Sequence, residues 1–256
     1  MEPVISLAAE PLFHIGTMPI TNTLIVAWVI VLLVVVTVMM ASRRYRAVPR
    51  GVQNLLEVVF EGALSFMTTI TGSREKSRRF FPVVMTIFLF VILSNWVEIV
   101  PGLGSIGLWA EHEGKRVLIP FIRSSSADLN VTLALAIASV VATQIIGIAS
   151  LGLFKYAGKF FVAPWKSPYL VGTFVGILEL ISECAKMVSF SFRLFGNIFA
   201  GEVLLLVVGF LAPYLVPLPF LFLEILVGFV QALVFSMLTL VFMTMAATPH
   251  EEHAEH

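Results

Sequence analysis

The sequence predicts an all-α polytopic membrane protein with about five membrane-crossing helices and one interfacial amphipathic helix. Of its 256 residues, 59% are hydrophobic and only 12% are charged, whereas a soluble domain has about 25% charged residues. The apolar runs are long and do not alternate with polar residues, which favours helices over a β-barrel. The net charge is zero and no basic patch is interleaved with aromatic residues, so nothing indicates nucleic-acid binding. We therefore expect a single membrane domain over residues 1–256.

The first predicted span covers residues 21–41, which is long enough to cross roughly 30 Å of hydrocarbon. The basic residues of segment 42–46 follow at once, which predicts a cytoplasmic C-terminal end for this span and an N-terminus outside. Residues 52–70 have apolar positions at helical spacing, interrupted by polar ones. We interpret this segment as an amphipathic helix at the cytoplasmic interface, with a poor transmembrane helix as the alternative. The basic cluster at 73–79 keeps its end on the same side.

The second span, residues 80–100, carries Glu98 near its outer end. We interpret Glu98 as an interfacial carboxylate that reaches water, with a place in an aqueous entry as the alternative. The outer loop that follows is polar, and we expect residues 118–121 to pack against the membrane surface. Asp128 begins the third span, residues 128–154, as the N-cap residue. Asn130 and further polar positions make this span more polar than the first, as suits a helix buried among others.

Residues 169–212 form one long run without proline. As a helix, it extends about 66 Å at about 1.5 Å per residue, roughly twice the thickness of the hydrocarbon. We predict one strongly inclined helix that crosses once, because two crossings need a break near Lys186, where no Gly or Pro stands. The last span, residues 220–246, follows a proline-rich turn and should pair with the long helix in antiparallel orientation. The polar tail, residues 250–256, then lies in the cytoplasm.

Arg193 stands in the middle of the long apolar run, where a full charge costs at least about 2.5 kcal/mol. Such a residue is a functional-site hypothesis by default. On a helical wheel it shares one stripe with several polar residues, while Glu202 points to the opposite side, roughly 13.5 Å along the axis. The residues of that stripe are Glu179, Ser182, Lys186, Ser189 and Asn197.

The last span supplies partners, because Glu224 and Gln231 are seven residues apart and so share one helical face. In an antiparallel hairpin, one register sets Glu224 level with Glu202 and Gln231 level with Arg193. Rotation about each helix axis stays undetermined. The register is therefore a geometric hint.

Two carboxyl groups close together in a medium of low dielectric cannot both ionise easily, so such a pair can hold and release a proton. Proton relay is the simplest use, since the sequence has neither metal-ligand spacing nor a nucleophile–base pair, and we expect no cofactor and no metal. The alternative for Glu202 and Glu224 is that both are snorkelling acids near the helix ends. Arg193 does not titrate in the physiological range, but it can hold a passing carboxylate deprotonated. Its alternative role is a structural ion pair with Glu183 or Glu179.

The stretch from Ser189 to Glu202, SFSFRLFGNIFAGE, resembles the signature of subunit a of the rotary F-type ATP synthase. The similarity extends over nearly the whole chain. The signature's arginine falls on Arg193, its asparagine on Asn197 and its acid on Glu202. The family's second polar position, where some members carry histidine, falls on Glu224, and its glutamine falls on Gln231.

The resemblance implies a non-catalytic stator subunit in a bacterial plasma (inner) membrane. Its partners would be the lipid bilayer, protons, the peripheral-stalk b subunits and a rotating ring of c subunits. Each c subunit would present a carboxylate to Arg193, which blocks a straight proton leak and forces rotation. Two offset aqueous half-channels would load and unload that carboxylate. Glu202 and Glu224 would line the outer one, with Gln231, Asn197 and Ser189 along the path. The resemblance favours protons, although some members of the family use sodium.

Further polar residues of the spans are candidates for a secondary path. They are Glu98, Asp128, Asn130, Glu179, Glu183 and Lys186. The rival function is a self-contained ion-coupled secondary transporter with an arginine-centred anion site, which the lack of inverted repeats and of broken helices disfavours. A purely structural scaffold is a third alternative, and an arginine in mid-membrane argues against it.

Overall fold

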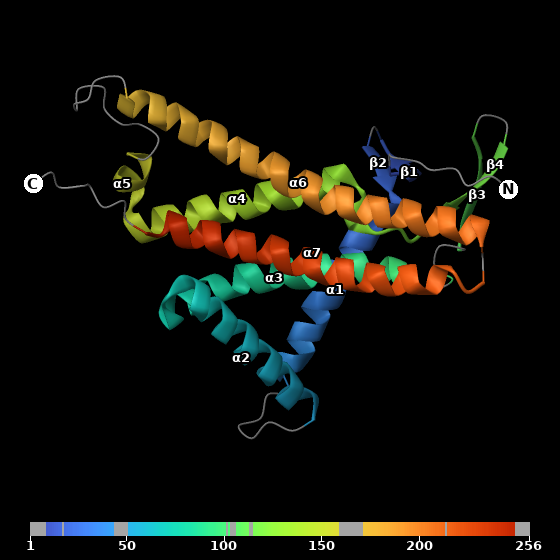
Figure 1. Ribbon diagram of the computed structural model, residues 1–256, viewed down its shortest axis with the longest axis horizontal. Helices are drawn as coiled ribbons and strands as arrows, with labels where there is room; N and C mark the ends of the chain where they lie inside the picture. The colour runs from blue at the N-terminus through green and yellow to red at the C-terminus, as the bar shows by residue number, and fades with distance from the viewer. Residues whose placement is uncertain are drawn as a thin grey trace, which may run out of the picture.

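The computed structural model describes residues 9–16, 18–43, 51–100, 102, 106–112, 115–158, 171–212 and 214–248, and the structural statements below concern these. The chain is helical apart from two small hairpins (Figure 1). Its helices are α1 (Asn22–Arg43), α2 (Val52–Thr71), α3 (Arg74–Ile99), α4 (Leu129–Leu151), α5 (Leu153–Ala157), α6 (Val171–Leu211) and α7 (Pro217–Ala246), with a 3-10 turn, η2 (Ser125–Ala127).

Five of the described helices are long and apolar enough to cross a membrane, as the sequence predicts. These candidate spans are Asn22–Met40, Arg74–Ile99, Leu129–Leu151, Phe174–Leu211 and Pro217–Ala246. The predicted polar tail and the first two residues of the predicted long helix lie outside the described residues. The inclination of α6 to a membrane stays a prediction, as does the interfacial position of α2.

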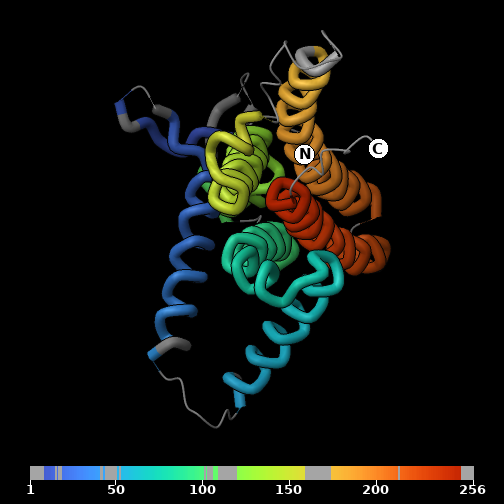
Figure 2. Tube along the Cα trace, turned by 90° about the vertical axis from the view of Figure 1, so that its left-hand side faces the viewer, coloured from blue at the N-terminus to red at the C-terminus, as the bar shows by residue number. Residues whose placement is uncertain are grey.

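Helices α3, α4, α6 and α7 form the body of the molecule and run along its long axis (Figure 1). Figure 2 looks along this group and shows α1 and α2 projecting away from it on one side. Helix α7 packs against α3, α4 and α6. Helices α6 and α7 meet at the turn that joins them and run antiparallel, as predicted, and α6 diverges from α7 toward its own N-terminal end.

Local signals explain where the helices begin and end, and they correct two predicted bounds. Helix α3 begins six residues before the predicted start, because Ser73 caps it and accepts from the backbone N–H of Lys76. Asp128 caps α4 as predicted, accepting from the N–H of Asn130 at 2.9 Å. Helix α4 ends at Leu151 rather than residue 154, because Gly152 takes a φ of 83° that favours glycine. Helix α6 is unbroken over 41 residues.

The sequence analysis did not predict the two antiparallel hairpins. Strands β1 (Pro11–Ile15) and β2 (Met18–Thr21) precede α1, and β3 (Gly107–His112) pairs with β4 (Lys115–Pro120) in the loop between α3 and α4. The segment expected to lie on the membrane surface is therefore, as far as Pro120, part of a hairpin strand. These strands have four to six residues, too few for a clear pattern of alternation.

Two clusters of buried apolar side chains hold the helices together. The larger joins α3, α4, α6 and α7, and the smaller joins α2 to α3 and α7. Small polar residues tie the same helices together: the hydroxyls of Ser139 and Thr239 lie 2.8 Å apart between α4 and α7, and those of Thr132 and Ser191 lie 3.2 Å apart between α4 and α6. Such contacts let helices associate in lipid, where apolar burial alone does not drive packing. They also fix which face of α6 points outward.

Candidate functional site

Arg193 lies on the exposed face of α6, in the second half of the helix. The packing of Phe190, Ser191 and Leu194 against the other helices sets this orientation, because all three are buried. The guanidinium donates to Ser189 Oγ at 3.5 Å, a long hydrogen bond. No carboxylate of the described residues forms an ion pair with it. The exposed guanidinium of Arg193 can therefore pair with an anion from outside the chain.

The surroundings of Arg193 on that face are apolar. Phe192 is 57% exposed and Val188 is 53% exposed. Large exposed apolar residues continue along the first half of the helix, at positions 174, 175, 177, 178, 180 and 181. A contiguous apolar surface of this kind marks contact with lipid or with another protein.

Asn197, one turn beyond Arg193, donates a 2.8 Å hydrogen bond to Gln231 Oε1 on α7. The sequence analysis set Gln231 level with Arg193, and this register is wrong by one helical turn. The two helices are not parallel cylinders, so a constant index sum cannot hold along their whole length. Gln231 is nevertheless buried on the side of α7 that meets α6. Within the described residues, its Nε2 atom has no hydrogen-bond partner.

Four charged side chains converge toward the end of the molecule where α6 and α7 are joined. Glu98 comes from α3, Glu202 from α6, Glu224 from α7, and Arg123 from the loop before η2. Glu98 lies within electrostatic range of the other three. Glu224 packs against Gly201, where an added Cβ would approach its Oε1 to 2.7 Å. We call these four residues the acidic cluster.

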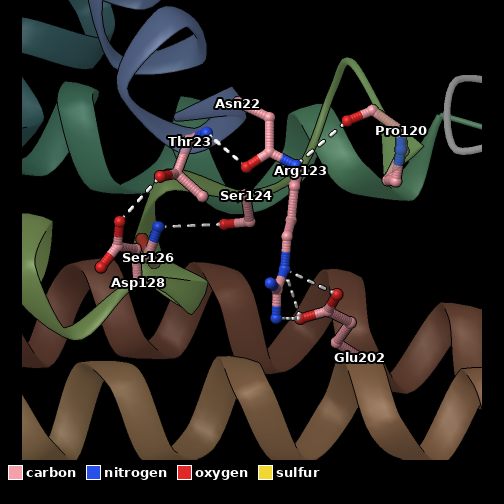
Figure 3. A network of polar contacts seen from close by, with 8 residues as sticks. All are labelled: Asn22, Thr23, Pro120, Arg123, Ser124, Ser126, Asp128 and Glu202. Carbon is pink, nitrogen blue, oxygen red and sulfur yellow. Dashed lines mark hydrogen bonds and ion pairs between the residues drawn. The ribbon is translucent and has the colours of Figure 1, made fainter. Parts of the chain in front are cut away.

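The Arg123 guanidinium contacts both oxygens of the Glu202 carboxylate (Figure 3). Its Nε lies 2.9 Å from Oε1 and 3.3 Å from Oε2, and its second nitrogen donates to Oε2 at 3.0 Å. The Arg123 side chain is only 8% exposed and that of Glu202 21%. Both carboxylate oxygens are therefore engaged by one largely buried cation.

The sequence analysis missed Arg123. Its ion pair joins residues 79 positions apart, which no local pattern reveals. The one local feature that could have indicated Arg123 is its place as a single basic residue between the apolar run 117–122 and three serines.

The loop that carries Arg123 is tied to the start of α1 (Figure 3). Asn22 Nδ2 donates to the carbonyl of Pro120 at 3.0 Å, and Thr23 Oγ1 donates to Asp128 Oδ2 at 2.8 Å. The Ser125 hydroxyl donates to the Thr23 carbonyl at 3.1 Å. Asp128 thus has a structural part as N-cap and as tether, and Asn130, whose N–H it binds, is exposed.

A seam of buried polar atoms runs between α3 and α7 from the acidic cluster toward Gln231. Asn95 Nδ2 donates to the carbonyl of Gly228 at 3.1 Å, and the absence of a side chain at Gly228 permits this approach. Buried polar atoms are nearly always satisfied by protein or by ordered water, so unpartnered ones are places where ordered water would bind. The unpartnered atoms are Ser94 Oγ, Asn95 Oδ1, Glu98 Oε2, Glu224 Oε2 and Gln231 Nε2.

A second polar group lies toward the N-terminal half of α6. Lys186 Nζ is 2.7 Å from Glu183 Oε1 and stands over the ring of Phe242 at 4.7 Å. The cation that pairs with Glu183 is therefore Lys186, and the alternative of an Arg193–Glu183 pair is wrong. Tyr156, on α5, donates to Gln144. Burial, followed by the charges of Glu183 and Glu179, raises the pKa of Tyr156 to about 12.

The site residues thus separate into three places. Arg193 and Ser189 face outward on α6, and Glu183 and Lys186 form their own pair nearer its N-terminus. Glu202, Glu224 and Glu98 meet in the acidic cluster, with Asn197 and Gln231 between that cluster and Arg193. In the part of the chain that the structure describes, no group of three or more His, Cys, Asp or Glu side chains could hold a metal ion.

Residues 24–244 match the family model described as "ATP synthase A chain". The chain is 32% identical over 232 residues to ATP synthase subunit a of Moorella thermoacetica, covering 90% of this chain and 93% of that one. It is 35% identical over 241 residues to ATP synthase subunit a of Campylobacter jejuni, covering 94% and 91%. Its identity to ATP synthase subunit a of Syntrophobacter fumaroxidans is 36% over 218 residues, covering 84% and 80%.

Proposed function

Because the chain belongs to the ATP synthase A chain family, we propose that it is the stator subunit that carries protons past a ring of c subunits and couples their flow to rotation. Members of this family are non-catalytic membrane subunits, so the chemistry to be explained is proton transfer. The observation that carries the proposal is Arg193, an exposed cation on an apolar helix face without a carboxylate partner among the described residues.

Arg193 acts on a carboxylate that arrives from outside the chain. An arginine keeps its charge at every physiological pH, and a cation beside a carboxyl group favours its ionised form. A ring carboxylate that reaches Arg193 therefore gives up its proton and pairs with the guanidinium. The fixed positive charge of Arg193 repels a proton, so a proton cannot pass this position directly. The straight route from one side of the membrane to the other is therefore closed. The exposed apolar surface around Phe192 is the face that we assign to the ring.

The outer half-channel is the polar seam between α3, α6 and α7. It begins at the acidic cluster and continues through Asn95 to Gln231 and Asn197, one turn from Arg193. Glu202 is nine residues from Arg193, or roughly 13.5 Å along the helix. The seam spans this gap, and water in it would bring protons to the level of the ring carboxylate. We infer that the acidic cluster lies on the outer side of a bacterial inner membrane, with the C-terminus in the cytoplasm.

We infer the partners from the family and assign them to the exposed apolar faces. The c ring occupies the exposed face of α6, and the peripheral-stalk b subunits and lipid cover other apolar surfaces. Helix α1 has a long row of exposed apolar residues between Trp28 and Met40, which is suited to such contacts.

The test of this function is ATP-driven proton pumping in membrane vesicles that contain the assembled complex. Arg193→Ala should abolish pumping while the chain still co-purifies with the ring. The matched control is Arg78→Ala, which removes another exposed arginine, in the first turns of α3, and should leave pumping intact. Normal coupled pumping in the Arg193 variant would overturn the proposal.

A further inference from the structure

We propose that Arg123 is a positioning residue that keeps Glu202 as its fixed partner, so that protons pass the acidic cluster through Glu98 and Glu224. This inference rests on the proposed function and narrows it, because it separates the carboxylates that carry protons from the one that balances charge.

The first argument is the geometry of the ion pair. A guanidinium fork that engages both oxygens of a carboxylate is rigid and leaves few lone pairs open to a proton. The three nitrogen–oxygen distances of the Arg123–Glu202 pair lie between 2.9 and 3.3 Å. A proton that binds Glu202 has to displace one of these contacts. Arg123 itself cannot take up or release a proton in the physiological range.

The second argument is that Arg123 is held from the far side of its own loop. Its neighbour Ser124 caps the η2 turn by accepting from Ser126 N–H at 3.2 Å. That turn is tied to Thr23 through Ser125, and Asn22 holds the end of β4 at Pro120. The backbone that carries Arg123 is thus held by contacts that do not involve Glu202.

The third argument is the contrast with Glu98 and Glu224. Each has a buried Oε2 atom for which the described part of the chain provides no hydrogen-bond partner. An unpartnered buried carboxyl oxygen is open to a water molecule or to a proton. These two atoms come from α3 and α7, the two helices that also contribute the polar seam toward Gln231. The open oxygens therefore lie on the path, whereas those of Glu202 are occupied.

The fourth argument is the charge balance. The cluster holds three carboxyl groups and one cation, and Glu10 adds a further negative charge near Glu202. Arg123 neutralises one carboxylate. Besides Glu10, two negative charges remain if Glu98 and Glu224 both ionise, and their repulsion in a buried place favours a proton shared between them. In each passage, a hydronium ion transfers one proton to Glu98 and becomes a water molecule. The proton then passes through water to Glu224, and Glu98 becomes a carboxylate again. Glu224 in turn releases the proton to water in the seam and returns to its starting state.

The test compares passive proton conductance, as a function of pH, in vesicles whose membrane sector is assembled but free of the catalytic sector. Conductance is normalised to the amount of chain that co-purifies with the ring. In Glu202→Gln, the Arg123 charge no longer acts on a carboxylate at position 202 and should favour the ionised forms of Glu98 and Glu224 more strongly. The midpoint of the pH profile should then move down by on the order of one pH unit. The charge-neutral double variant Arg123→Gln/Glu202→Gln should return the midpoint to the parental value and restore conductance to within about threefold, a difference of less than 1 kcal/mol.

Glu98→Gln and Glu224→Gln should lose conductance by about tenfold or more, in the parent and in the double variant alike. A double variant that assembles but conducts no better than Glu202→Gln would overturn the inference, because Glu202 would then be a carrier itself. If the double variant fails to assemble, the single variant Arg123→Lys provides the test. It keeps the positive charge, so the midpoint of its conductance–pH profile should equal that of the parent. A shifted midpoint in Arg123→Lys, or an unshifted one in Glu202→Gln, contradicts the inference. Coupled pumping in Arg193→Ala would instead sink the proposed function.

Discussion

Asn197 on α6 and Gln231 on α7 are joined by a 2.8 Å hydrogen bond, which fixes the height at which the last helix meets the long one. Glu224 then falls beside Gly201, two helical turns nearer the joining turn than Gln231. This contact between two amide side chains therefore contributes to the position of Glu224 relative to Arg193.

Asn197→Ala should destabilise the assembled membrane sector by about 1–3 kcal/mol, because it leaves buried Gln231 without its donor. The double variant Asn197→Ala/Gln231→Leu should be more stable than the single one, since it removes both polar groups. Thermal unfolding of the purified subunit–ring complex measures both. A double variant less stable than Asn197→Ala would show that the register does not depend on this bond.

Gly201→Ala should lower passive proton conductance several-fold without preventing assembly. The added Cβ would stand 2.7 Å from Glu224 Oε1 and 3.2 Å from its Cδ, so the carboxyl group has to move. The matched control is Gly209→Ala on the same helix, where a Cβ meets nothing within 4 Å. Equal conductance in the two variants would contradict the importance of the Glu224 position.

Lys186→Met should destabilise the complex by about 1–3 kcal/mol, because it leaves Glu183 without the ammonium 2.7 Å away. Adding Glu183→Gln removes the carboxylate charge and should recover most of that loss. Melting temperatures of the two variants and the parent complex check this prediction. A Lys186→Met complex as stable as the parent would show that Glu183 needs no counter-charge there.

Tyr156 should remain a neutral phenol up to strongly alkaline pH. Its pKa is raised from 10.0 to about 12 by burial and by nearby carboxylates, so the fold favours the protonated form. Its contribution to stability is therefore complete below pH 10 and is lost as the pH rises toward 12. The near-ultraviolet absorbance of the parent and of Tyr156→Phe is titrated against pH. The difference between the two curves should show no phenol ionisation near pH 10. An ordinary tyrosine titration in that difference would refute the prediction.

The apolar periodicity and length of the runs were enough to predict the five spans, the unbroken α6 and its antiparallel pairing with α7. Asp128 as N-cap was also predictable, because capping is a local interaction. The start of α3 was missed, since its first turns are basic and Ser73 rather than hydrophobicity sets its beginning. The hairpins were missed because their strands have only four to six residues.

The candidate site was predictable where one helix carries it, as at Arg193, Ser189 and Asn197. It was not predictable where distant segments meet. The Arg123–Glu202 pair depends on a loop folded back onto α6, and the Asn197–Gln231 bond depends on the crossing of two helices. Neither the fold of a loop nor a crossing angle is encoded in a local pattern. For the same reason, the sequence left open whether Arg193 pairs with Glu183 or Glu179, and it did not predict the Lys186–Glu183 pair.

The most direct test of the account is to measure pumping and leak on the same Arg193→Ala vesicles. If Arg193 closes the straight path, the variant should lose ATP-driven pumping but keep, or increase, passive proton conductance through the membrane sector. Loss of both together, with the chain still bound to the ring, would make Arg193 a structural residue. Retention of coupled pumping would contradict the account outright.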